Sequence, residues 1–330
     1  MVMRYRLLGK TGFKVSEISL GTWQVGGRWG SKFDPDLAEG ILKRAIDGGV
    51  NFLDTADVYT DGESEKAVGK IIRQASKRIY VATKCGRQIQ PHVSKGYTPQ
   101  VLRSYVEDSL RRLNLECIDL IQLHCPPMEV YYRPEIFGEF EKLKHEGKIL
   151  NLGVSIEKVE EGLKALEFEN VTTIQLIYNI FRQRPHEFLF ARARQKNVGL
   201  IIRVPLASGL LSGKFSPATR FAAGDHRFFN RNGMMFDKGE TFSGVNYEKG
   251  LSSVARLIKL FPENTILAHV ALRWILMREE ISCIIPGASS PEQVAMNLQA
   301  EDFPPLTEDQ MAAIRNIYNE DIKPMVHQLW

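Results

Sequence analysis

Residues 99–123 read PQVLRSYVEDSLRRLNLECIDLIQL and contain one repeat of the pattern that decides the fold. Pro99 to Leu113 carries apolar residues at three- and four-residue spacing, which predicts a helix with one buried face. Asp119 to Leu123 is a short apolar run, which predicts a buried strand. Alternation of such helices and strands along a chain indicates βα units around a parallel sheet.

The same alternation continues along the chain in both directions. Further helical patterns cover Asp36 to Asp47, Pro134 to Glu146 and Glu157 to Leu166. The seven other predicted strands are Glu17 to Leu20, Asn51 to Asp54, Arg78 to Thr83, Ile149 to Val154, Thr173 to Gln175, Gly199 to Val204 and Cys283 to Pro286. Eight strand–helix repeats without a Pro/Ser-rich linker predict an α/β fold, a closed (β/α)8 TIM barrel that residues 1–330 form as a single domain. The alternative of two doubly wound halves fits the pattern less well.

Three segments lie outside the repeats. Tyr5 to Val15 contains a Lys-Thr-Gly turn and is predicted to form a hairpin that plugs the barrel floor. Ser212 to Gly250 mixes Gly, Asp, Asn and Phe without a period, which is typical of a long loop. Because this loop follows the seventh strand, we expect it to face the chemistry of the barrel. The stretch from Leu306 onward is expected to be a helical extension at the carboxyl end.

Composition and charge exclude several classes of protein. The chain has 43 Lys and Arg against 39 Asp and Glu, a net charge of +4, and 44% hydrophobic residues. These values favour a globular protein and give no indication of a nucleic-acid or membrane-surface partner. The four cysteines form no CxxC pair, and no apolar run is long enough to span a bilayer. We therefore expect reduced thiols, a cytoplasmic location and no membrane anchor.

Polar residues follow three consecutive predicted strands at the ends where barrels carry their chemistry. Asp54 ends the second strand, Tyr59 comes five residues later, Lys84 follows the third strand, and His124 follows the fourth. A lysine ammonium beside a tyrosine lowers the pKa of the phenol, and a carboxylate keeps that lysine charged. A neutral histidine can hydrogen-bond a carbonyl oxygen. Together these residue types predict proton delivery during carbonyl reduction.

Each of these residues also has a structural explanation. Asp54 could cap a helix, and Lys84 could be a solvated strand end. His124 could be a hydrogen-bonded core histidine, and Tyr59 could cover the barrel rim with its ring. Their coincidence at the ends of three neighbouring strands favours the catalytic interpretation.

From end to end, the chain resembles the aldo-keto reductase superfamily. The opening segments Leu8 to Gly12 (LGKTG) and Leu20 to Trp23 (LGTW) are similar to those of the family. The most specific match is Asn51 to Gly69, NFLDTADVYTDGESEKAVG. Two further matches are Val81 to Lys84 (VATK) and Asp119 to His124 (DLIQLH).

This resemblance implies roles for five residues. Tyr59 would be the general acid, and Lys84 with Asp54 would be the pair that tunes it. His124 would orient the substrate carbonyl, and Trp23 would form a wall of the substrate pocket beside Tyr59 and His124. The loops at Trp29 and at Cys125 to Tyr132, with the Phe-rich insertion, are further candidates for the pocket wall.

The cofactor site is not of the Rossmann or P-loop kind. No GxGxxG follows a strand, and the near match from Gly209 to Phe215 (GLLSGKF) is one residue too short for a Walker motif. The resemblance instead implies a nicotinamide dinucleotide that lies across the barrel mouth. The implied contacts are Gly21, Thr22, Asp54, Ser155, Gln175, Arg203, Pro205, Leu206, Ser208, Gly209, Leu211, Lys214, Gly287, Ser289, Gln293 and Asn297. Within this set, Ser155 and Gln175 would hold the carboxamide.

Two departures from the family pattern concern the cofactor. Ile156 stands where the family usually has Asn, and Met296 stands where an acidic residue is frequent. We favour NADP(H) over NAD(H), because Lys214 and the Arg220 to Arg231 segment could supply the positive charge that a phosphate monoester needs. That segment could also be a solvated lid without a phosphate role.

Three functions remain open from the sequence. The first is reversible NAD(P)H-dependent reduction of an aldehyde or ketone to the alcohol, with hydride from nicotinamide C4, a proton from Tyr59 and no metal. The second is a cofactor-sensing regulatory or channel-associated subunit of the same fold. The third, a phosphate-binding barrel isomerase, would leave Asp54 and Tyr59 without a role. The expected partner is a small carbonyl or alcohol substrate, and no apolar seam indicates an oligomeric state.

Overall fold

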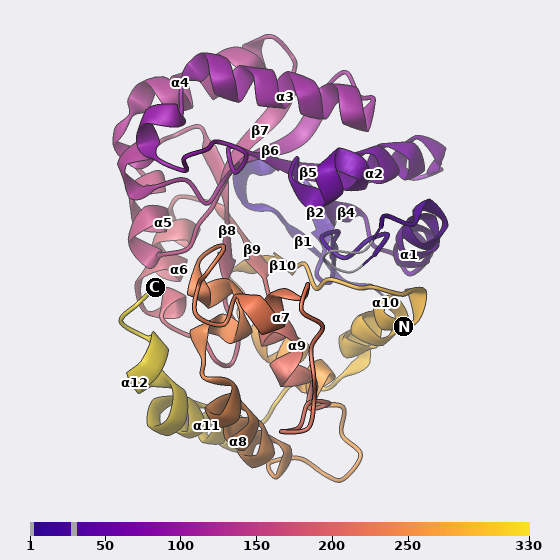
Figure 1. Cartoon of the computed structure of the whole chain (residues 1–330), viewed down its shortest axis with the longest axis vertical. Coiled ribbons are helices and arrows are strands. Elements are labelled where there is room, and N and C mark those ends of the chain that lie inside the picture. Colours follow the sequence, from indigo (N-terminus) through magenta and orange to yellow (C-terminus); the bar gives the residue numbers. More distant parts are fainter. Residues whose placement is uncertain (1–2, 28–31) are drawn as a thin grey trace.

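A barrel of eight parallel strands forms the centre of the computed structural model, which describes residues 3–27 and 32–330 (Figure 1). The strands lie side by side in chain order. They are β3 (Leu20–Gly21), β4 (Phe52–Asp54), β5 (Tyr80–Cys85), β6 (Ile118–His124), β7 (Ile149–Ser155), β8 (Val171–Ile177), β9 (Gly199–Arg203) and β10 (Ile281–Ile284). The predicted α/β barrel is confirmed.

The barrel closes where residues 17–21 meet β10. Ser19 N donates to Ile284 O at 2.9 Å, and Ile284 N donates to Glu17 O at 2.9 Å. Gly21 N then donates to Pro286 O at 3.3 Å. A Cβ on Gly21 would lie 2.8 Å from the Ile285 carbonyl oxygen, so only glycine allows the two backbones to approach this closely.

Every strand differs from its predicted bounds by at least one residue, and two of these differences have a clear structural reason. Glu17 to Leu20 was predicted as the first strand, but regular pairing with β4 covers only Leu20–Gly21, because the residues before it bond to β10 instead. Thr173 to Gln175 was too short a prediction, since β8 runs from Val171 to Ile177 and is buried throughout. A fully buried strand lacks the polar alternation that would mark its ends.

Helices cover the outside of the barrel, as Figure 1 shows. Helix α1 packs against both α2 and α10, so the ring of helices joins the last repeat to the first. The helices of the repeats are α1 (Pro35–Asp47), α2 (Glu63–Gln74), α3 (Pro99–Leu113), α4 (Pro134–His145), α5 (Val159–Ala165), α6 (Pro185–Gln195), α8 (Tyr247–Ile258), α9 (Leu267–Leu276) and α10 (Pro291–Leu298).

Local capping explains two of the helix boundaries. The α3 helix has the predicted bounds because the Thr98 side chain accepts from Val101 N, and Asn114 ends the helix in a left-handed conformation (φ 51°). The α5 helix starts at Val159, two residues later than predicted. The Glu161 carboxylate accepts from the backbone N–H groups of Glu157 and Lys158, which holds these residues outside the helix.

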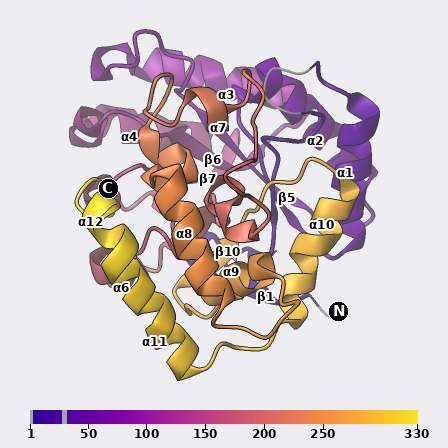
Figure 2. The same ribbon diagram turned by 60° about the horizontal axis from the view of Figure 1, so that its bottom comes forward.

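The segments outside the repeats have the expected forms. Strands β1 (Tyr5–Leu7) and β2 (Lys14–Ser16) make an antiparallel hairpin, whose Leu8 and Phe13 join the cluster that fills the inside of the barrel. The segment Ser212 to Gly250 is mostly loop with the short helix α7 (His226–Phe229) before α8 begins. At the carboxyl end, α11 (Glu308–Ile317) lies beside α8, and α12 (Lys323–Val326) follows (Figure 2).

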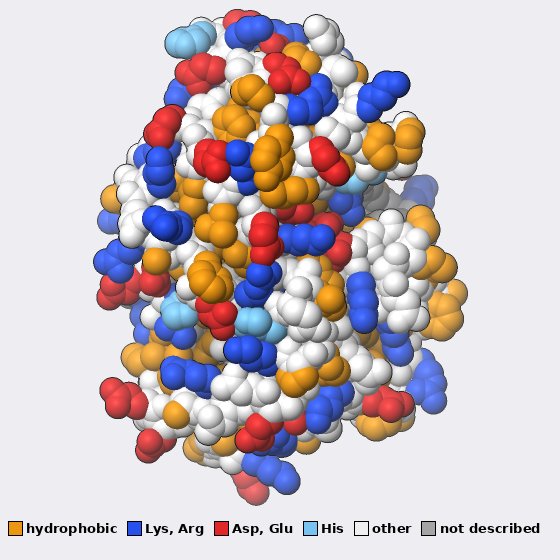
Figure 3. Space-filling view, turned by 90° about the vertical axis from the view of Figure 1, so that its left-hand side faces the viewer, with side chains coloured by type: hydrophobic (Ala, Val, Ile, Leu, Met, Phe, Trp, Pro, Cys, Tyr) orange, Lys and Arg blue, Asp and Glu red, His pale blue; other side chains and the backbone are white. Residues whose placement is uncertain are grey.

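Surface charge is mixed on the face drawn in Figure 3, where Lys and Arg side chains alternate with Asp and Glu. This mixture agrees with the small net charge of +4. Within residues 3–27 and 32–330, no helix has the length and apolar character that crossing a membrane requires. All four cysteines carry free thiols.

Candidate active site

A cavity of about 970 Å³ opens at the carboxyl ends of the strands. Its wall includes Trp23 after β3, Asp54 at the end of β4, Tyr59 in the following turn and His124 at the end of β6. The long segment after β9 covers one side. In a (β/α)8 barrel this is the end that carries catalytic residues, so the cavity is the candidate active site.

Asp54, on the wall of this cavity, forms a buried ion pair with Lys84. Lys84 Nζ lies 2.5 Å from Asp54 Oδ1 and donates at 2.7 Å to the Thr55 carbonyl oxygen. Only 1% and 2% of the two side chains are exposed. Burial lowers the pKa of Lys84, but Asp54 and Tyr59 outweigh burial, so its pKa is raised and the ammonium stays charged.

Tyr59 lies within reach of this ammonium because of the turn that follows it. Lys84 Nζ lies 3.2 Å from the Tyr59 hydroxyl and 4.8 Å from the centre of its ring. Thr60, Asp61 and Gly62 all have positive φ (49°, 54° and 86°), which reverses the chain directly after the tyrosine. Positive φ at two consecutive residues other than glycine is a strained arrangement, and such strain is often found at functional sites.

The net electrostatic effect on Tyr59 differs from the expectation. Burial raises the pKa of its hydroxyl more than the charge of Lys84 lowers it, and the pKa therefore lies above its ordinary value. The charge of Lys84 lowers the pKa of Tyr59, as expected, but this effect is smaller than the effect of burial. The phenol is consequently protonated at neutral pH, which is the form that a general acid requires.

His124 completes the group. Its ring centre lies 6.2 Å from that of Tyr59 at an angle of 83°, and its buried Nδ1 has no partner among the described residues. Burial, followed by the positive charges of Lys84 and Arg87, holds its pKa well below the ordinary value, so the imidazole is neutral. Sequence reasoning named Asp54, Tyr59, Lys84 and His124 as one set, and the structure brings all four together.

Sequence reasoning missed Gln122, which takes part in the same network. Gln122 Nε2 donates to Asp54 Oδ2 at 3.0 Å, and Gln175 Nε2 donates to the same oxygen at 2.7 Å. The signal was present in the sequence, because Gln122 is the polar residue two positions before His124 and side chains alternate along a strand. Gln175 was predicted to hold a cofactor carboxamide, but here its amide nitrogen is bonded to Asp54.

Most of the predicted cofactor residues lie on the cavity wall. They are Gly21, Thr22, Asp54, Gln175, Arg203, Pro205, Leu206, Ser208, Gly209, Lys214, Gly287, Ser289, Gln293 and Asn297. The other two, Ser155 and Leu211, do not reach it. Ser155 is buried, with its hydroxyl 3.6 Å from Cys125 Sγ, and Leu211 packs in the core between the barrel and its helices. Their cofactor contacts stay predictions.

The chemistry of the wall fits a dinucleotide. The cavity volume lies at the upper end of the usual range for small-molecule sites, about 300–1,000 Å³. Lys214 has only a weak acceptor among the described residues, Met296 Sδ at 3.7 Å, and the buried Nε of Arg203 has no partner there. Helix α10 begins beside Ser289 with Ser290 as its cap, which supplies a helix N-terminus for a phosphate.

The segment after β9 contributes to the pocket as expected. Phe215, Phe221 and Phe236 reach the cavity wall, and His226 packs against Trp23 with ring centres 4.8 Å apart. Of the loop from Cys125 to Tyr132, only Cys125 reaches the wall. Trp29, which was also a candidate, lies outside the described residues.

A second charged group lies on the wall, and its ion pairs were not predicted. Arg203 forms an ion pair with Glu240, and its Nη2 donates to the Ile156 carbonyl oxygen at 2.9 Å. Arg87 lies beside this pair on the wall and meets Glu157, with Nη1 and Oε1 3.5 Å apart. Sequence spacing gave no indication that the segments with Arg87 and Glu157 meet those with Arg203 and Glu240.

Comparison with known proteins agrees with this geometry. A model of the aldo/keto reductase family matches residues 17–319. The chain belongs to this family. Aldo-keto reductases are oxidoreductases that act on small molecules and use nicotinamide cofactors, and this general description holds for the present aldo-keto reductase.

Three relatives are similar over almost their full length. An uncharacterized oxidoreductase of Bacillus subtilis (strain 168), YqkF, is 30% identical over 97% of this chain and 98% of its own. The holo form of aldo-keto reductase AKR11C1 from Bacillus halodurans superposes with a TM-score of 0.77 at 29% identity, covering 96% of each chain. The glycerol dehydrogenase AKR11B4 from Gluconobacter oxydans has the same TM-score and identity over 99% of this chain and 97% of its own.

Asp57, between Asp54 and Tyr59, is a buried carboxyl group with neither oxygen hydrogen-bonded to a described side chain. Burial, with repulsion from Glu65, raises its pKa to about 7, although Arg112 lowers it in part. An unfolded aspartate has a pKa of about 3.9. Ionisation of Asp57 therefore destabilises the fold, and this cost grows as the pH rises from about 4 through 7.

We expect Asp57→Asn to raise the thermal midpoint at pH 8.5 and to change it little at pH 5.5, because the amide cannot ionise. The free-energy gain at the higher pH should be on the order of 1–3 kcal/mol, since about 1.4 kcal/mol accompanies each unit of pKa shift and the amide is itself costly to bury. Thermal unfolding at both pH values measures the effect. Asp47→Asn, at an exposed position at the end of α1, is the control. Equal midpoints for Asp57→Asn and the unmodified protein at pH 8.5 would contradict the assignment.

Proposed function

We propose that this aldo-keto reductase reduces an aldehyde or ketone to the alcohol with NADP(H), in a reversible reaction that residues 1–330 carry out as a single domain. The observation that carries the proposal is that Asp54, Tyr59 and His124 converge on one part of the cavity wall, with the Lys84 ammonium within hydrogen-bond distance of both Asp54 and the Tyr59 hydroxyl. A protonated phenol and a neutral imidazole there face the same space. This is the arrangement that a carbonyl oxygen needs as negative charge develops on it.

Each residue of the group has one task in the proposed reaction. Tyr59 donates its proton to the carbonyl oxygen, and His124 hydrogen-bonds that oxygen and orients it. Lys84 stabilises the phenolate left behind, since its ammonium is 3.2 Å from the hydroxyl. Asp54 keeps the ammonium in place, while Gln122 and Gln175 hold the second carboxylate oxygen.

A nicotinamide dinucleotide, when bound, supplies the hydride from C4 of its reduced ring. The chain would hold it with the loop after β9, from Pro205 to Lys214, and with Ser289 and Gln293 at the start of α10. Lys214 and Arg220 on the same wall favour NADP(H), because a 2′-phosphate is a dianionic group that such side chains bind well. The substrate would then occupy the side of the cavity that is lined by Trp23 and by the Phe residues of the segment after β9.

Tyr59→Phe should lower kcat/KM for carbonyl reduction by about 100-fold or more, because general acids contribute roughly 10²–10⁴ in rate. Binding of the reduced cofactor, measured by fluorescence titration, should stay within about twofold. Tyr105→Phe on the outer helix α3 is the matched control and should leave both quantities unchanged. Wild-type rates for Tyr59→Phe would rule out this proton donor. Cofactor binding by the unmodified protein without turnover of any aldehyde or ketone would favour a cofactor-sensing subunit instead.

Cofactor preference is tested separately by titrating the protein with NADPH and with NADH. We expect NADPH to bind at least about 10-fold more tightly, and the difference to shrink as ionic strength rises, because charge on the 2′-phosphate provides it. Equal affinities, or tighter binding of NADH, would overturn the preference. The assignment of the proton donor would be unaffected by that result.

A further inference from the structure

Arg87 is a charged side chain on the cavity wall for which the proposed reaction has no use. It follows Lys84 by three residues, so its Cα lies within about 11 Å of that of Lys84. Gly86 between them has a φ of 102°, and a Cβ there would lie 2.8 Å from the Tyr97 ring. This glycine turn brings the chain from the end of β5 to the cavity wall, where Arg87 lies with Tyr59 and His124.

The guanidinium of Arg87 is poorly satisfied by its neighbours. Its one charged partner among the described residues is Glu157, at 3.5 Å, and this contact is an ion pair without a hydrogen bond. Glu157 is not part of the cavity wall, and the two side chains remain 24% and 20% exposed. An arginine has five N–H donors in a planar fork that matches an anionic oxygen group. Most of these donors are therefore available to a ligand.

The other charged groups nearby cancel one another. Arg203 and Glu240 on the same part of the wall form an ion pair, and Arg203 donates a further hydrogen bond to the Ile156 carbonyl oxygen. Lys84 and Asp54 are likewise paired. Arg87 is held more loosely than these pairs, by a single contact with Glu157 at 3.5 Å among the described residues.

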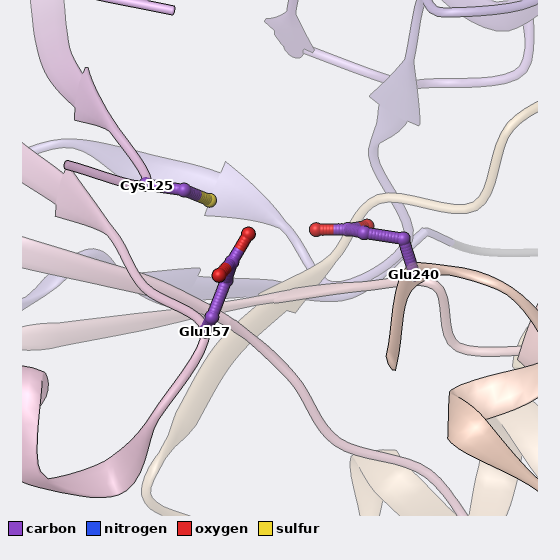
Figure 4. A group of neighbouring side chains, drawn as sticks. All are labelled: Cys125, Glu157 and Glu240. Atoms are coloured by element: carbon purple, nitrogen blue, oxygen red, sulfur yellow. The ribbon is translucent and has the colours of Figure 1, made fainter. Parts of the chain in front are cut away.

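The carboxylates near Arg87 are not arranged for a metal ion. Figure 4 shows Cys125, Glu157 and Glu240 pointing toward one another, and their ligand atoms lie within 4.8 Å. The Arg203 guanidinium, however, already contacts both Glu240 and Cys125 Sγ. Burial raises the pKa of the Cys125 thiol to about 12, so the sulfur is protonated and a poor ligand. The guanidinium groups of Arg87 and Arg203 therefore balance the negative charges of Glu157 and Glu240.

We propose that Arg87 binds an anionic oxygen group, a carboxylate or a phosphate, on the substrate whose carbonyl lies against Tyr59 and His124. This inference rests on the reductase function proposed above and names the substrate class within it. A bidentate contact at Arg87 would fix the distal end of the substrate and so align its carbonyl for reaction. Arg87 is then a specificity-determining residue.

Glu157 makes this recognition dependent on pH. Burial and the negative charges of Glu240 and Asp237 raise the pKa of Glu157 to about 7, against the opposing effect of Arg87 and Arg203. His92 is also close to Arg87, and burial, followed by the charge of Arg87, lowers its pKa. Below pH 7 Glu157 is protonated and no longer pairs with Arg87, so the guanidinium is available to the substrate anion. Above pH 7 the Glu157 carboxylate competes with that anion for Arg87. The preference for anionic substrates should therefore be larger at pH 6 than at pH 8.

The test compares each anionic aldehyde with a neutral counterpart. The pairs are 4-oxobutanoate with its methyl ester and glyceraldehyde 3-phosphate with glyceraldehyde. In the unmodified enzyme we expect kcat/KM to be at least about 10-fold higher for the anionic member of one pair, which identifies the group as carboxylate or phosphate. Arg87→Gln should remove this preference mainly through KM and leave the neutral member within about twofold. Arg87→Lys should restore part of it, and Arg194→Gln, an exposed arginine of α6, should change nothing.

Two results would overturn the proposal: no preference for either anion in the unmodified enzyme, or an equal loss for both members of a pair in Arg87→Gln. If no aldehyde is reduced at all, the reductase function fails, but the anion site can still be judged. Calorimetric titration of the cofactor-loaded protein with succinate, and with inorganic phosphate, against dimethyl succinate decides this case. Binding of either anion that is lost in Arg87→Gln supports the site, and equal binding by both proteins rejects it.

Discussion

The buried ion pair between Lys84 and Asp54 is the interaction on which the site depends. Two charges removed from water are costly unless each is paired and hydrogen-bonded, and removing one partner of such a pair typically costs about 3–5 kcal/mol. Here β4 supplies the carboxylate, β5 supplies the ammonium, and β6 and β8 supply the amides of Gln122 and Gln175. Four strands must keep their register for the pair to be satisfied. The same ammonium faces the Tyr59 hydroxyl, so the stability of the barrel and its proposed chemistry rest on one group.

Much of the fold could be predicted from the sequence because its repeats are regular. Helix α3 has the predicted bounds, since Thr98 and Pro99 at its start and Asn114 at its end act locally. The strand at Leu20–Gly21 was placed less well, because the residues just before it bond to β10, more than 260 residues later, and no local pattern reveals that partner. Barrel closure is a property of the whole chain.

The proposed catalytic set was accessible to sequence reasoning for a geometric reason. Parallel strands of a barrel end on the same side, so polar residues that follow neighbouring strands must meet. Gln122 could have been found from the alternation of side chains along β6, since it stands two positions before His124. The contact of Arg203 with Glu240 could not, because 37 residues separate them and the segment between has no periodic pattern. The pKa of Tyr59 was also beyond reach, since it depends on how deeply the ring is buried, which side-chain types alone do not state.

The most direct test of this account is a crystal structure of the protein with its oxidised cofactor and an unreactive amide analogue of an aldehyde substrate. The account predicts that the amide oxygen accepts hydrogen bonds of about 3 Å from both the Tyr59 hydroxyl and a ring nitrogen of His124. It also predicts that the Lys84 ammonium remains bonded to Asp54. An oxygen bound elsewhere in the cavity, with Tyr59 or His124 turned away from it, would contradict the account.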